Sequence, residues 1–160
     1  MRVAWFLLAV PVLASCGVSS VTKTTSATGA RAVPRLTQKS FVTEGNLVCL
    51  RSDRRVYKLG TLSLDPSGWA KVAAAARTAM TEMRKLRPPT DDQARFDRLL
   101  ALGRRLEDGI VHVHAALVRH DVAAARRSQS GAKTVSAEIH AQAHRLGLTF
   151  CQQTLTNWPA

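Results

Sequence analysis

The sequence predicts an all-α protein, an up-down-up-down four-helix bundle that follows a signal peptide and a disordered tether. Three observations predict it. Apolar residues recur every three or four positions in four segments, helix start and stop signals bound those segments, and the connections between them are short. With 160 residues, 46% of them apolar and 21% charged, the chain suffices for one globular domain and is neither a polytopic membrane protein nor fully disordered.

The first two predicted helices have clear boundaries. The first spans about 40–59, although Gly45 and Asn46 lower the helix propensity of its early turns. Asp65 is typical of an N-cap, and the prolines at 88 and 89 end the second helix. The residues expected to face the core are Phe41, Val48, Cys49, Val56 and Leu59 in the first helix and Trp69, Val72, Ala76, Met80, Met83 and Leu86 in the second.

The third and fourth helices show the strongest periodicity. Thr90 and Gln93 match a capping box, Asp121 begins the fourth helix, and Gly147 ends it. The residues expected to face the core are Phe96, Leu99, Gly103, Leu106, Ile110, Val113 and Leu117 in the third helix and Val122, Ala125, Ala132, Ser136, Ile139, Ala143 and Leu146 in the fourth. Helices of this length with short connections pack as antiparallel neighbours.

The N-terminus has the form of an export signal. Met1 and Arg2 give a positive start, and the apolar run at 3–14 is too short to cross a bilayer, which needs about 20 residues. We expect 1–15 to be a signal peptide; a buried N-terminal core helix is the alternative. The Ser-, Thr-, Gly- and Ala-rich stretch that follows predicts a flexible tether, so that 16–39 is lipidated cysteine and tether, 40–151 the bundle and 152–160 a C-terminal tail.

The end of this segment, Leu13-Ala14-Ser15-Cys16, resembles the lipobox of bacterial lipoproteins. The resemblance implies that the Cys16 thiol receives a diacylglyceryl group, that the signal is cut before it, and that the new amine is acylated. Two or three acyl chains anchor a protein stably. We therefore expect a lipid-anchored protein at the cell membrane, facing outside the cytoplasm. The alternative is that Cys16 is an ordinary residue near a conventional cleavage site.

The cysteine count agrees with this location. Of three cysteines, Cys49 and Cys151 remain as one pair if lipid takes Cys16, and outside the cytoplasm such a pair is oxidised. Catalytic or metal-binding thiols are the alternative, but no CxxC and no suitably spaced His occur. A disulfide requires Cα atoms within about 7 Å, and therefore a tail that folds back along the first helix.

The mature domain as a whole resembles small helical lipoproteins of actinobacteria. The resemblance spans about 41–151 and is carried by Cys49, by Leu86-Arg87-Pro88-Pro89 and by Ala143-x-x-Leu146-Gly147-Leu148-x-x-Cys151. It implies a helical bundle cross-linked by cysteines and anchored outside the cytoplasm. It transfers no catalytic residue.

Two histidines are the candidates for a metal site. His140 and His144 lie four residues apart, on one side of the fourth helix, where such a pair can hold one ion. No further ligand completes the pair in sequence, and no HExxH occurs. We therefore expect no metal centre and no cofactor, and interpret the five histidines as solvated or boundary residues.

No catalytic motif points to an enzyme. The sequence lacks GxSxG and Cys/His arrangements, and it has no Gly-rich phosphate loop. Its carboxylates lie mostly at helix starts or near Arg, where capping and surface pairing explain them. We expect a non-enzymatic protein.

The basic surplus is the feature that bears on partners. Loss of Arg2 with the signal leaves 22 basic against 11 acidic residues, a net charge of +11. Export argues against nucleic acid as a partner, and 5% aromatic residues leave few stacking platforms. Anionic lipid, an anionic wall polymer or an acidic envelope protein remain. The residues expected to contact such a surface are Lys23, Arg31, Arg35 and Lys39. The alternative is an ordinary solvated surface.

These observations favour an envelope interaction or structural module anchored by lipid. The alternative is a lipoprotein that binds a metal or small ligand at the His140 and His144 flank or in a cavity of the bundle.

Overall fold

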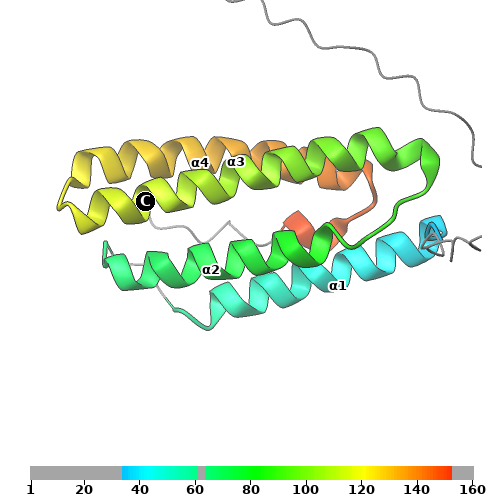
Figure 1. Ribbon diagram of the computed structural model, residues 1–160, viewed down its shortest axis with the longest axis horizontal. Helices are drawn as coiled ribbons and strands as arrows, with labels where there is room; N and C mark the ends of the chain where they lie inside the picture. Colours follow the sequence, from blue (N-terminus) through cyan, green and yellow to red (C-terminus); the bar gives the residue numbers. More distant parts are fainter. Residues whose placement is uncertain (1–33, 61–63, 153–160) are drawn as a thin grey trace, which may run out of the picture. The chain divides into compact units, whose positions relative to one another are not determined.

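The computed structural model describes residues 34–60 and 64–152, and this part of the chain is an all-α bundle, as the sequence predicts (Figure 1). Successive helices run antiparallel, up-down-up-down. The elements are α1 (Gln38–Tyr57), α2 (Pro66–Met83), the 3-10 turn η1 (Thr90–Asp92), α3 (Gln93–Val118), α4 (Val122–Arg145) and the 3-10 turn η2 (Thr149–Gln152). Within the described ranges, no helix is long and apolar enough to cross a membrane.

Two of the three predicted helix caps have the expected form. The Asp65 carboxylate accepts a hydrogen bond from the Gly68 amide at 3.1 Å, and Asp121 accepts one from the Ala124 amide at 2.9 Å. The hydroxyl of Ser67 also donates to Asp65, and these bonds lower the pKa of the Asp65 carboxyl. Both aspartates therefore fix where a helix begins.

The start of α3 differs from the predicted capping box. Thr90 opens η1, because the Asp92 amide bonds to the Pro89 carbonyl at 3.1 Å and tightens the first turn. Asp92 then occupies the N-cap position without a side-chain cap bond, and its Oδ1 accepts from Arg95 Nη1 at 3.0 Å. The Asp92 carboxylate thus pairs with the Arg95 guanidinium and not with an unpaired backbone amide in the first turn of α3.

The folded part begins earlier than the sequence indicates. Arg35 Nη1 donates to the carbonyl of Pro88 at 3.0 Å and to Gln93 Oε1 at 2.8 Å, and the Leu36 amide bonds to the Arg87 carbonyl at 2.8 Å. Lys39 lies in the first turn of α1. The structure therefore corrects the assignment of Arg35 and Lys39 to the tether, because both belong to a segment fixed by α1 or by the loop before α3.

The helices pack in chain order, α1 on α2, α2 on α3 and α3 on α4. The fourth side of the bundle is different. Within the described residues, the backbones of α1 and α4 do not approach each other directly; η2 contacts both and lies between them (Figure 1). The C-terminal segment thus takes the place of a direct α1–α4 contact.

Two apolar clusters form the core. The first core cluster lies around the C-terminal segment and consists of Phe41, Val48, Cys49, Met83, Leu86, Phe96, Leu99, Ala143, Leu146, Leu148 and Cys151. Phe41 and Phe96 meet edge to face in it, with ring centroids 5.3 Å apart. The second core cluster consists of Trp69, Val72, Ala73, Ile110, Val113, Ala116, Leu117, Ala125 and Ala132. Val122, expected to face the core, is 41% exposed, because it occupies the first turn of α4.

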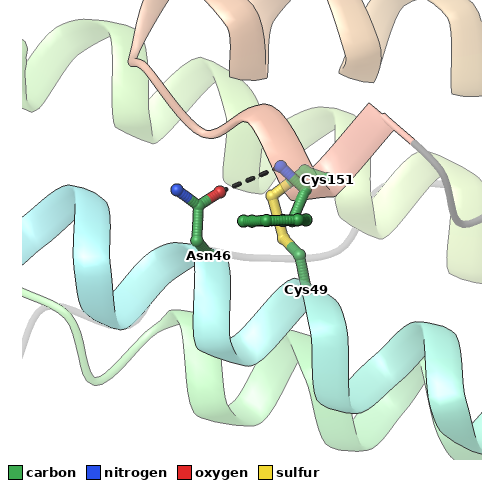
Figure 2. The surroundings of a disulfide bond; sticks show 4 residues. Asn46, Cys49 and Cys151 are labelled. Atoms are coloured by element: carbon green, nitrogen blue, oxygen red, sulfur yellow. Dashed lines mark hydrogen bonds between the residues drawn. A yellow bond between two sulfur atoms is a disulfide. The ribbon is translucent and has the colours of Figure 1, made fainter.

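Gly45 and Asn46, which lower the helix propensity of α1, are the places where the C-terminal segment docks on it. Leu148 is fully buried, and a β-carbon at Gly45 would lie 2.6 Å from its Cδ2. Asn46 Oδ1 accepts a hydrogen bond from the Phe150 amide at 3.0 Å (Figure 2). Gly147 turns the chain toward α1 with a φ of +76°, a conformation that favours glycine.

Gly45→Ala and Gly131→Ala form a matched test of this docking. Both remove a helical glycine, which by itself adds about 1 kcal/mol to stability. A β-carbon at Gly131 meets nothing within 4 Å, so we expect Gly131→Ala to be stabilising. At Gly45 the new methyl collides with the buried Leu148, and overpacking of this kind costs about 1–3 kcal/mol. Urea unfolding measures both variants. Equal gains in unfolding free energy would contradict the close contact.

Candidate functional site

An apolar cavity of about 120 Å³ lies where the two core clusters meet. All four helices and η2 contribute to its wall, and it is partly open. The lining residues are Val48, Cys49, Ser52 and Val56 from α1, Val72, Ala76, Ala79, Met80 and Met83 from α2, Leu99, Leu100, Gly103 and Leu106 from α3, Ile139 and His140 from α4, and Cys151 from η2. None of these side chains is a carboxylate, an ammonium or a guanidinium.

Small residues create this space. Ala76 and Ala79 present only methyl groups on the cavity side of α2, and Gly103 interrupts the row of larger apolar residues on α3. The thioether of Met80 lies so close to Gly103 that a β-carbon there would collide with it. A flexible, polarisable side chain thus fills part of the gap and leaves the remainder empty.

A disulfide forms one part of the cavity wall. Cys49 and Cys151 are joined with a Cα–Cα distance of 4.9 Å across 102 residues of sequence, within the limit that the sequence analysis set (Figure 2). Both residues are buried. The tail after α4 folds back along α1, as this pairing requires.

His140 contributes the only titratable side chain of the lining. It is half-buried on α4, and its Nε2 lies 3.5 Å from the hydroxyl oxygen of the buried Ser136. Burial lowers the pKa of the His140 imidazole. The ring is therefore neutral at pH 7 and places a hydrogen-bonding group in an otherwise apolar wall.

The structure places the two candidate metal ligands in different surroundings. His140 lines the cavity, whereas His144, one turn later, is exposed. Across 34–60 and 64–152, no group of three or more His, Cys, Asp or Glu side chains is placed to hold a metal ion. His120 has a different role, because it ends α3 with a left-handed φ of 58°.

One carboxylate ties α1 to α2 beside the cavity. Glu82 accepts from Arg55 Nη2 at 2.8 Å and lies 2.9 Å from Arg51 Nη2. The hydrogen bond from Arg55, with that from Arg51, lowers the pKa of Glu82 against the opposing effect of burial. This acidic side chain therefore has a structural role in the contact between the two helices.

The remaining predicted site residues divide into two groups. Cys16, Lys23 and Arg31 lie outside the described residues. Arg35 and Lys39 are both exposed, although Arg35 is held by its hydrogen bonds to the loop before α3. The structure thus places these two near the N-terminal end of α1.

The sequence allows a ligand cavity in the bundle as an alternative, but it does not identify the residues that line one. It assigned Met80 and Gly103 to core-facing rows, and both do face inward, but it did not bring them together. The available signal was a glycine in a row of large apolar residues on one helix and alanines in the facing row of another. Such a pairing of small residues indicates unfilled space only once the helix register is known.

Comparisons of the chain with protein-family models, with curated proteins and with solved structures find no match.

Removal of the disulfide tests its contribution to stability. In the chain-entropy model a cross-link that closes a loop of about 100 residues contributes about 4.7 kcal/mol. We expect the double variant Cys49→Ser, Cys151→Ser to have a free energy of unfolding about 4 kcal/mol lower than the parent, as measured by urea unfolding. Peptide mapping without reduction should find the two cysteines linked in the parent chain. Under reducing conditions the parent and the double variant should unfold alike. Free thiols at both positions in the oxidised parent would contradict the link.

The lowered pKa of His140 makes stability depend on pH. Between the lowered value and the ordinary 6.5, the unfolded chain binds more protons than the folded chain, so stability falls as the pH drops through this range. We expect His140→Gln to flatten the slope of unfolding free energy against pH as the pH falls through the ordinary imidazole pKa of 6.5. An unchanged slope in His140→Gln would contradict the burial of the ring.

Proposed function

We propose that this chain is a lipoprotein, anchored at the outer face of the cell membrane through Cys16, whose bundle is a non-enzymatic envelope interaction module. The observation that carries the proposal is the division of the three cysteines. Cys16 ends a lipobox-like sequence after an apolar run, and the other two are joined in the folded domain. A disulfide of this kind is typical of compartments outside the cytoplasm.

The use of the carboxylates supports a non-enzymatic role. Asp65 and Asp121 cap helices, and Glu82 joins α1 to α2. Four further or shared carboxylates of the described ranges form ion pairs with arginines: Glu82 with Arg51 and Arg55, Glu107 with Arg77, Asp92 with Arg95, and Glu138 with Arg105. Each of these acidic groups has a structural partner.

The charge balance supports an anionic partner. The chain carries 23 basic and 11 acidic residues, so pairing leaves a large basic surplus. At a membrane surface this surplus meets anionic lipid head groups first, and each nearby basic residue contributes about 1 kcal/mol there. The basic residues that follow the proposed anchor most closely in sequence are Lys23, Arg31, Arg35 and Lys39. An anionic wall polymer or an acidic envelope protein would use the same charges.

Substitution of the proposed lipid acceptor tests the anchor. We expect the Cys16→Ser protein to lack the mass of the lipid and to leave the membrane fraction, because the bundle then has no covalent link to acyl chains. Mass spectrometry and fractionation measure both properties. Ser19→Ala, three residues away, should remain acylated and membrane-bound. A Cys16→Ser protein that stays in the membrane fraction, or a parent chain that carries no lipid mass, would refute the proposal.

A further inference from the structure

The chain enters the bundle at the end where α2 passes to α3. The Leu36 amide bonds to the Arg87 carbonyl at 2.8 Å, and Arg35 Nη1 donates to the Pro88 carbonyl at 3.0 Å. The segment before α1 and the α2–α3 connection therefore lie side by side at one end of the bundle, which we call the near end (Figure 1). The passages from α1 to α2 and from α3 to α4 lie at the opposite end, the far end.

The near end carries a surplus of positive charge. Its two segments outside the helices, 34–37 and 84–92, contain four basic and two acidic residues, which are Arg35, Arg84, Lys85 and Arg87 against Asp91 and Asp92. Asp92 is already paired with Arg95. The far-end connections, 58–65 and 119–121, contain two basic and two acidic residues and therefore have no surplus.

The basic side chains of the α2–α3 connection are accessible and held in place. Arg84, Lys85 and Arg87 are exposed, and none of them belongs to an ion pair within 34–60 and 64–152. Between and beside them, Leu86 and Pro88 are buried, and Leu86 is part of the first core cluster. The connection is therefore fixed to the bundle, and its three charges project from a defined position.

The proposed lipid anchor brings this end closest to the membrane, and at this step the inference rests on the proposed function. The proposed anchor Cys16 precedes the described bundle by 17 residues, 17–33. As the flexible tether that their composition predicts, these residues have a root-mean-square reach of about 23 Å. α3 has 26 residues and is about 39 Å long at 1.5 Å per residue. Contact through the far end would therefore require a much more extended tether than contact through the near end.

We propose that the near end is the membrane-facing surface of the bundle, and that Arg84, Lys85 and Arg87, with Arg35 beside them, bind the head groups of anionic phospholipids. Guanidinium groups match phosphate oxygens with paired hydrogen bonds, and a lysine ammonium adds a point charge. An anionic leaflet attracts basic residues that lie within about one Debye length of it, about 8 Å at physiological salt. The bundle thus stands on one end, and its far end points away from the membrane.

Two double variants form a matched pair. Both are made in the full-length chain with Cys16→Ser, in which no acyl chain holds the protein on a vesicle. Arg84→Gln with Arg87→Gln removes two cations from the near end, and Lys58→Gln with Arg119→Gln removes two from the far end. All four side chains are exposed, and each pair includes a helix C-cap residue. The two variants therefore have equal net charge and comparable changes at helix ends.

Vesicle binding measures the preference for anionic lipid. Each protein is titrated with phosphatidylglycerol vesicles and with phosphatidylcholine vesicles, and the ratio of the two affinities is compared. Residues 1–39 are identical in the three proteins, so their contribution is common to all. We expect the near-end variant to lower the ratio at least about tenfold, since each basic residue at an anionic surface contributes about fivefold. The far-end variant should keep the parent's ratio within about twofold.

Two results would overturn the proposal. Equal ratios for the two variants would show that the bundle binds through its total charge or through another face. An equal loss of binding to soluble polyphosphate by the near-end variant would show that these residues bind an anionic polymer and are not specific to a lipid surface. Neither result depends on acylation, so a failure here leaves the proposed anchor at Cys16 intact, and an unacylated parent chain would leave the vesicle result unchanged.

Discussion

The link between Cys49 and Cys151 is the constraint on which the placement of α1 depends. Among the helices of the described ranges, only α2 approaches the backbone of α1 closely, and η2 contacts α1 as well. The disulfide therefore joins the first helix to the segment that follows the last one. Leu148 against Gly45 and the bond from Phe150 to Asn46 fix the same contact non-covalently. Helix α1 and the segment after α4 are therefore held together by covalent and non-covalent contacts.

The cavity follows from this arrangement. A 3-10 turn between α1 and α4 holds the two helices apart at one end, and the first core cluster fills that end with large side chains. Toward the second core cluster the wall changes to alanines and a glycine, which cannot close the distance. The resulting space costs packing energy, because its lining loses dispersion contacts on one side.

The extent to which the sequence predicts this structure depends on the range of the interactions. Helix periods and the Asp65 and Asp121 caps are local, and they agree with the structure. Gly45 and Asn46 lower the helix propensity of α1, and their contacts are with Leu148 and Phe150, about a hundred residues later in the sequence. No pattern within α1 therefore explains why these two residue types occur there. Gln142 is buried, and its Nε2 donates a hydrogen bond to the Arg95 carbonyl at 3.0 Å, which satisfies the amide through a contact between two helices. The cavity belongs to this second kind, since it depends on the register of Met80 against Gly103.

The redox state of the Cys49–Cys151 pair bears on the cavity as well as on the fold. Both cysteines line the cavity, so the redox state of the pair affects the cavity wall as well as the stability of the fold. In a reducing compartment α1 would keep its contact with Leu148 and the hydrogen bond at Asn46, but the covalent link across the wall would be lost. In an oxidising compartment the wall is complete. An oxidising environment is therefore the condition under which this bundle keeps both the stability from its cross-link and the complete cavity wall.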